Sequence, residues 1–119
     1  MNNASYKNIN LEYLEVMSDG DVETKKTMLE MLLSDLPNDL REMRQLLDEK
    51  NWGDLSRASH KMKSTLSFVG NTPMIEANKE LEQLAKQADN PDQIESLMRI
   101  LEDTLDPVLS ELREELEAL

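Results

Sequence analysis

Leucine, methionine and other apolar residues recur at steps of three and four along most of this 119-residue chain. That spacing places them on one face of an α-helix, which has about 3.6 residues per turn. No run rich in β-branched residues competes with the pattern, and only three residues are glycine. The sequence therefore predicts an all-α protein with apolar stripes over four long segments, residues 29–47, 55–69, 74–88 and 94–116.

Residues with helix-capping properties stand at the ends of these segments. Asp21 offers a carboxylate that can cap the first long helix, and Gly70-Asn71 is typical of a helix C-terminus. Thr72-Pro73 and Asn90-Pro91 each place a polar cap before a proline in the first helical turn. These signals predict where the long helices begin and end.

Two prolines lie inside the long stripes. The first stripe keeps its phase across Pro37, so we expect one kinked helix there rather than two, and a further kink at Pro107. The connections between the four helices are short, and short connections join antiparallel neighbours. The predicted fold is an all-α, antiparallel up-down-up-down four-helix bundle.

A shorter apolar pattern precedes the bundle and predicts a short leading helix that stops at Ser18-Asp19-Gly20. We expect residues 1–8 to be a flexible leader and residues 9–119 to form the bundle domain. The apolar side chains of the leading helix either cover one end of the bundle or present a patch beside the histidine to a partner. The candidate docking residues for the second alternative are Ile9, Leu11, Leu14, Met17 and Arg57.

Composition and charge argue against several classes of partner. Thirteen basic residues against twenty-five acidic ones give a net charge of −12, which repels nucleic-acid phosphates and anionic lipids. The chain has no cysteine, so it has no disulfide and no thiolate metal site. Its first residues do not resemble a signal peptide, and no apolar run approaches the roughly 20 residues that span a bilayer. We therefore expect a soluble, cytoplasmic monomer that binds neither nucleic acid nor membrane.

The chain has a single histidine, His60, which lies two residues before Met62 and so about 200° away from it around the helix. Lys63, Ser64 and Ser67 share its polar face. A neutral imidazole is a good nucleophile, and a lysine one turn away can offset the charge of a phosphoryl group. This pattern indicates a phosphoryl acceptor that takes Mg²⁺ and its other catalytic groups from a partner. On spacing alone, an incidental surface histidine is the simpler interpretation.

Other chemistries find little support in the residues. Metal sites in helical bundles usually need Glu-x-x-His pairs, but Arg57 stands three residues before His60 and there is no second histidine. The chain contains no nucleophile elbow, no phosphate-binding loop and no dinucleotide fingerprint. We expect no metal site, no cofactor of the protein's own and no autonomous kinase activity.

Several stretches of the chain form a specific combination. The first is the motif His60-x-x-Lys63-Ser64, followed by Val69-Gly70. The others are Ile9-Asn10-Leu11, Leu29-x-x-Leu32-Leu33-x-x-x-Pro37, Asn51-Trp52 and Leu81-Glu82-x-Leu84. Together they resemble the histidine-containing phosphotransfer (HPt) domain family, whose active helix is similar to the first motif. The resemblance covers most of residues 9–118 and is specific in combination rather than in any one stretch.

The resemblance implies an HPt four-helix bundle in which His60 is phosphorylated on Nε2 and Lys63 neutralises the phosphate. Ser64 stands where the family most often has glycine, and with Ser67 it would let a partner approach closely. Gly70 would end the active helix with a tight turn.

One position departs from the resemblance. Twenty-two residues after the histidine, some members of the family have a glutamine, and here the residue is Glu82. A carboxylate at this position can hold the Nδ1 proton and orient the ring, but it also repels phosphate. The part of Glu82 in the site therefore stays open.

The function implied by the resemblance is that of a carrier. It takes a phosphoryl group from the aspartyl phosphate of one receiver domain, in a response regulator or a hybrid histidine kinase, and passes it to another. Mg²⁺ is expected on the receiver. The alternative is a non-catalytic helical adaptor or a degenerate HPt-like interaction module, in which His60 is incidental.

Overall fold

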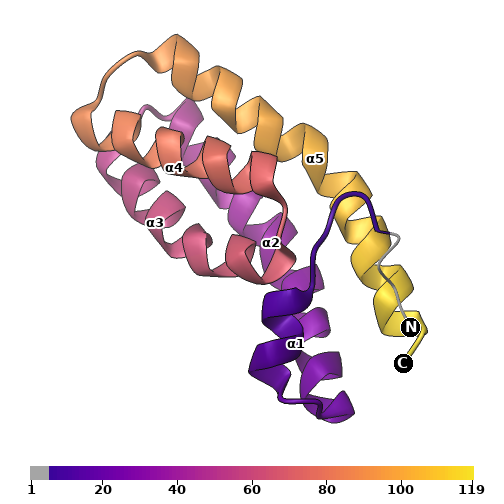
Figure 1. Cartoon of the computed structure of the whole chain (residues 1–119). Coiled ribbons are helices and arrows are strands. Elements are labelled where there is room, and N and C mark those ends of the chain that lie inside the picture. Colours follow the sequence, from indigo (N-terminus) through magenta and orange to yellow (C-terminus); the bar gives the residue numbers. More distant parts are fainter. Residues whose placement is uncertain (1–5) are drawn as a thin grey trace.

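The computed structural model describes residues 6–119, and this range is helical with no strand. In chain order the helices are α1 (Glu12–Ser18), α2 (Val22–Asp48), α3 (Trp52–Val69), α4 (Thr72–Gln87) and α5 (Pro91–Glu117). They form an elongated bundle with extents of 44 × 22 × 19 Å (Figure 1). The predicted all-α bundle is confirmed.

The four long helices surround one apolar core. α3 packs against α2 on one side and α4 on the other, and α5 closes the bundle by packing against α4 and α2. The connections of two or three residues between them are those expected of antiparallel neighbours. The largest fully buried side chains of these helices are leucine, methionine and isoleucine: Leu29, Leu36, Met43, Leu55, Met62, Leu66, Met74, Leu81, Ile94, Met98 and Leu101.

The helix ends agree with the sequence signals except at α4. The Asp21 carboxylate accepts a hydrogen bond from the Thr24 N–H at 3.0 Å and caps α2 as predicted. α4 is capped by Asn71, whose Oδ1 accepts from the Met74 N–H at 2.9 Å, so the prediction of Thr72 as the cap is wrong. Asn71 takes the position because its side chain does two things at once: while Oδ1 caps α4, the amide Nδ2 donates to the Asn8 carbonyl at 2.8 Å and ties the cap to the segment before α1.

α2 runs through Pro37 and α5 runs through Pro107 without interruption. Each proline removes one intrahelical hydrogen bond. The apolar face of each helix is nevertheless buried on both sides of its proline, by Leu36 and Leu40 in α2 and by Leu101 and Val108 in α5. The prediction of one helix across Pro37 is confirmed.

α1 covers the end of the bundle where α2 begins and α3 ends (Figure 1). Ile9, Leu11 and Leu14 are buried there, and the Asn10 N–H donates to the Val69 carbonyl at 3.0 Å. The first of the two alternatives for these residues is therefore correct. As docking residues, Ile9, Leu11 and Leu14 were predicted wrongly, because a partner cannot reach side chains that the core encloses. Met17 is half exposed.

The segment before α1 lies along α5. The Tyr6 hydroxyl donates to Glu115 Oε1 at 2.8 Å, while the Asn8 backbone N–H and side-chain Nδ2 donate to the two oxygens of Glu111, each at 2.8 Å. These bonds attach residues 6–8 to α5, where the sequence predicted a flexible leader. Residues 1–5 of that predicted leader lie outside the described residues.

A buried lysine joins α1 to the bundle through two ion pairs. Lys25 Nζ lies 2.6 Å from Glu115 Oε2 and 2.5 Å from Glu15 Oε2, so one ammonium group links α2 to α5 and α1. Burial by itself would raise the pKa of Glu115, but the hydrogen bonds from Lys25 and Tyr6 outweigh it and hold that pKa below its ordinary value. Burial and the Glu115 carboxylate raise the pKa of Tyr6.

Gly70 is required by two independent constraints. Its φ of 71° lies in the left-handed region, and a Cβ atom would lie 2.1 Å from the Asn10 carbonyl oxygen. We expect Gly70→Ala to lower the free energy of unfolding by more than the roughly 1–2 kcal/mol of left-handed strain alone. Gly20→Ala is the matched control, because Gly20 has φ 75° but no atom near its missing Cβ. Urea denaturation checks this, and equal losses in the two variants would contradict it.

The ion pairs of Lys25 with Glu15 and Glu115 make the stability of the fold depend on pH. Folding lowers the pKa of Glu115. The ionised carboxylate therefore contributes fully to the stability of the fold above the ordinary carboxyl pKa of about 4.3, and this contribution is lost as the pH falls through the lower pKa of the folded state. We expect Glu115→Gln to cost about 1.5–3 kcal/mol at neutral pH, the usual worth of hydrogen bonds to charged groups. The difference between the variant and the wild type should shrink as the pH drops below about 4.3. A difference in urea midpoint that stays constant with pH would contradict this account.

Candidate functional site

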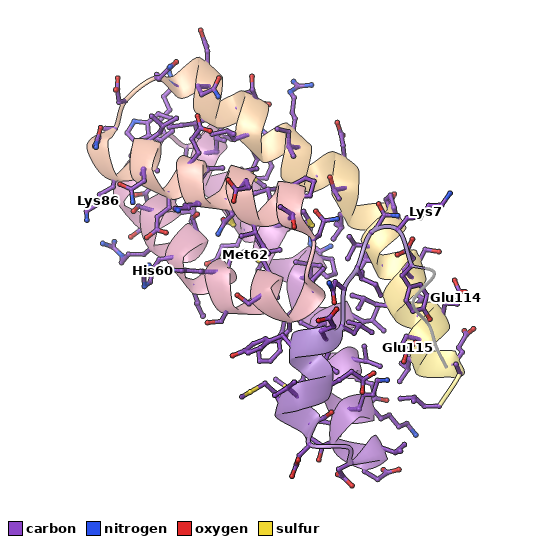
Figure 2. All side chains as sticks on the ribbon, in the orientation of Figure 1. Lys7, His60, Met62, Lys86, Glu114 and Glu115 are labelled. Carbon is purple, nitrogen blue, oxygen red and sulfur yellow. The ribbon has the colours of Figure 1, made fainter. Side chains whose placement is uncertain are left out.

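His60 lies in the middle of α3 with 69% of its side chain exposed. Figure 2 shows the ring directed away from the bundle, whereas Met62 points between the helices. The predicted polar face of α3 is confirmed as a solvent-facing surface, since Lys63, Ser64 and Ser67 are also exposed. The only accessible imidazole of the chain is therefore held on a rigid helix.

Glu82, on α4, lies beside the ring. Its Oε2 is 2.8 Å from Nδ1 of His60, and its side chain is only 18% exposed. An ionised carboxylate can only accept a hydrogen bond, so this contact places a proton on Nδ1. In the neutral ring, Nε2 then carries the free lone pair.

An open groove between α3 and α4, with a volume of about 650 Å³, runs past the histidine. Besides His60 and Glu82 it is lined by Gly53, Ser56, Arg57 and Lys86. Gly53 and Ser56 precede the histidine by seven and four residues, so they share its side of the helix, and their small size leaves space beside the ring.

Lys86 is a groove residue that the sequence analysis missed. It follows Glu82 by four residues and so lies on the same side of α4. Figure 2 shows Lys86 and His60 projecting on the same side of the molecule from their two helices. The helical spacing from Glu82 was the available signal, but only the packing of α4 on α3 brings that side of α4 to the histidine. Arg57, the other cation of the groove, hydrogen-bonds to Asp54.

Lys63 and Ser64 lie one turn beyond His60 and do not line this groove. The Ser67 hydroxyl donates to the Lys63 carbonyl at 3.0 Å, so it is turned back on its own helix. Ser64 instead lines a second groove of about 250 Å³, between α2 and α3, whose other lining residues are Met28, Met31, Leu32, Asp35, Thr65 and Phe68.

Apolar side chains that are exposed or partly buried gather at this second groove. Phe68 stacks on Tyr13 of α1 with a distance of 5.0 Å between ring centroids. Tyr13 is 48% exposed, and Met31 across the groove is 56% exposed. We call the three residues Tyr13, Met31 and Phe68 the apolar strip. It begins about two turns of α3 beyond the histidine.

Two features are absent from the part of the chain that the structure describes. Among residues 6–119, no three His, Cys, Asp or Glu side chains are grouped so that they could hold a metal ion. None of the helices in this range is long and apolar enough to cross a membrane.

Comparison with known proteins gives one family. The family model of the Hpt domain matches residues 27–119, which include His60, its neighbours on α3 and Glu82. No curated protein and no solved structure matches the chain. HPt domains are phosphocarrier modules of phosphorelays, and they interact with receiver domains in two-component systems. The match spans more than three quarters of the 119 residues, and the chain belongs to the HPt domain family.

Proposed function

We propose that this protein is a cytoplasmic, monomeric phosphocarrier that receives a phosphoryl group on Nε2 of His60 and passes it between the aspartates of receiver domains. The observation that carries the proposal is the contact between Glu82 Oε2 and His60 Nδ1, because in the neutral ring it leaves the lone pair on Nε2, in a side chain that is 69% exposed. Membership of the HPt family supports the same chemistry.

In the forward step the Nε2 lone pair attacks the phosphorus of an aspartyl phosphate. The bond between phosphorus and the aspartate oxygen breaks, and the aspartate leaves as a carboxylate. The phosphorylated ring keeps its Nδ1 proton and becomes cationic, so the Glu82 carboxylate stabilises it. In the return step a second aspartate attacks the phosphorus, and Nε2 leaves with its electron pair.

The position of Glu82 meets the objection that a carboxylate repels phosphate. The carboxylate faces Nδ1, and the ring stands between it and a phosphoryl group on Nε2. Cations lie on either side of the histidine: Lys86 and Arg57 line its groove, and Lys63 follows one turn along α3. In this proposal these groups offset phosphoryl charge, while the receiver supplies Mg²⁺.

The direct test is phosphotransfer from a receiver domain phosphorylated on its aspartate. We expect acid-labile, base-stable label on the wild type and only background label on His60→Gln, because the amide is not a nucleophile. Lys61→Gln is the matched control, since Lys61 is an exposed neighbour that does not line the histidine groove. Absence of label from every receiver of the host would favour the helical adaptor, with His60 incidental.

The apolar strip of Tyr13, Met31 and Phe68 is the docking surface that we propose for the receiver. Two of its residues, Met31 and Phe68, line the same groove as Ser64, and Ser64 lies about 6 Å along α3 from the histidine. In this proposal a receiver that brings its aspartate to Nε2 also covers the groove and reaches the strip. Exposed apolar side chains gathered in this way mark interaction sites. This surface replaces the buried Ile9, Leu11 and Leu14 that the sequence indicated.

We expect Met31→Asp to raise the receiver concentration needed for half-maximal transfer about tenfold, equivalent to about 1.4 kcal/mol, because a charge would enter an apolar contact. The rate at saturating receiver should stay unchanged, since Met31 does not touch the histidine groove. Ile100→Asp is the control, because Ile100 is exposed in a separate groove between α4 and α5. Equal effects of the two substitutions would place docking elsewhere.

A further inference from the structure

A buried polar pair joins α3 to α4 directly beside the phosphoacceptor. Ser59, next to His60 in the chain, is fully buried, and Asn78, one turn before Glu82, is 2% exposed. The Ser59 hydroxyl donates to Asn78 Oδ1 at 2.7 Å, and Asn78 Nδ2 donates to the Ser59 backbone carbonyl at 3.0 Å. The hydroxyl also lies 3.0 Å from the Asn78 carbonyl. Among residues 6–119, the side-chain polar groups of Ser59 and Asn78 form their hydrogen bonds with each other's residue.

The surrounding interface does not need such a pair for its apolar packing. The neighbouring buried side chains of α3 and α4 are Leu55, Met62, Ala77, Leu81 and Ala85. Apolar burial is non-directional and names no particular partner atom, whereas two buried hydrogen-bonding groups each require one. If α4 slid along α3, the hydroxyl and the amide would both lose their partners in the core, which is strongly unfavourable.

The same register decides which side chain meets the imidazole. A slide of one turn, about 5.4 Å, would bring Asn78 or Lys86 to the place of Glu82. A lysine ammonium only donates hydrogen bonds, so it cannot hold a proton on Nδ1. The bonds between Ser59 and Asn78 are therefore compatible with only one partner for Nδ1, the Glu82 carboxylate at 2.8 Å.

We infer that Asn78, with Ser59, is a positioning residue of the phosphoacceptor site. It acts through Glu82, by holding α4 in the register that keeps the proton of His60 on Nδ1 and the lone pair on Nε2. Its effect on phosphotransfer rests on the proposed carrier function. Its effect on the tautomer of the ring does not, and is measurable on the protein alone.

The test uses the fact that the chain has one histidine, so its ring nitrogens give the only imidazole signals in a ¹⁵N NMR spectrum. In basic solution, where imidazole rings are neutral, the wild type is expected to show a protonated Nδ1 and an unprotonated Nε2. The key variant is the double substitution Ser59→Ala with Asn78→Leu. It removes both polar groups together, so no unpaired group remains in the core and the protein is expected to stay folded.

We expect the double variant to show a clear shift of the ring toward the Nε2–H tautomer that free histidine prefers. Leu84→Ala, on the same helix, is the control for destabilisation, since it trims a partly buried side chain and leaves the polar pair intact. It should lower the unfolding midpoint without moving the ring signals. Wild-type ring signals in a folded double variant would overturn the inference, because the pair would then be purely structural.

Phosphotransfer separates this inference from the proposed function. If the wild type accepts phosphate, the double variant should do so about tenfold more slowly at saturating receiver, as expected when a reacting group loses its orientation, with half-saturation unchanged. A double variant that matches the wild type in rate would overturn the inference for transfer. If no receiver labels the wild type while the tautomer shift is seen, the positioning of the ring stands and the carrier function falls.

Discussion

The contact between α3 and α4 is the interaction on which the candidate site depends. α3 carries His60, the proposed nucleophile, and α4 carries the Glu82 carboxylate beside it, so neither helix makes the candidate site alone. A surface hydrogen bond such as that between His60 and Glu82 is weak on its own and could not align two helices. The alignment comes from the core beneath it, where leucine packing holds the helices together and the Ser59 and Asn78 bonds select their register.

The N-terminal segment and α1, which together cover one end of the bundle, stabilise the fold and do not line the histidine groove. Buried Ile9, Leu11 and Leu14 close one end of the core, and the Lys25 ion pairs join α1, α2 and α5. Because this cover leaves Tyr13 exposed against Phe68, it also supplies part of the apolar strip. One short helix thus adds to the core with one face and to the proposed receiver surface with the other.

Local signals predicted most of the helix ends, because a cap depends on a few neighbouring residues. Asp21, Asn90 and Gly70 behave as expected. Thr72 failed as a cap because Asn71 makes a further bond to the carbonyl of Asn8, which is distant in the chain. The docking residues failed for a similar reason. An apolar side chain in a short helix suits a core and an interface equally, and only packing decides which it joins.

For the site, the periodicity of the chain was sufficient to place His60, Lys63 and Ser64 on the solvent face of a rigid helix, because helical geometry relates residues three and four apart. It could not determine which residues from other helices would join them. Glu82 and Lys86 reach the histidine groove through the register of α4 on α3, and that register is set by contacts between residues nearly twenty positions apart. The placement of the proposed nucleophile, His60, is therefore a property of the sequence. Its tautomer and its charged surroundings are properties of the tertiary structure, since distances between helices are decided only when the core packs.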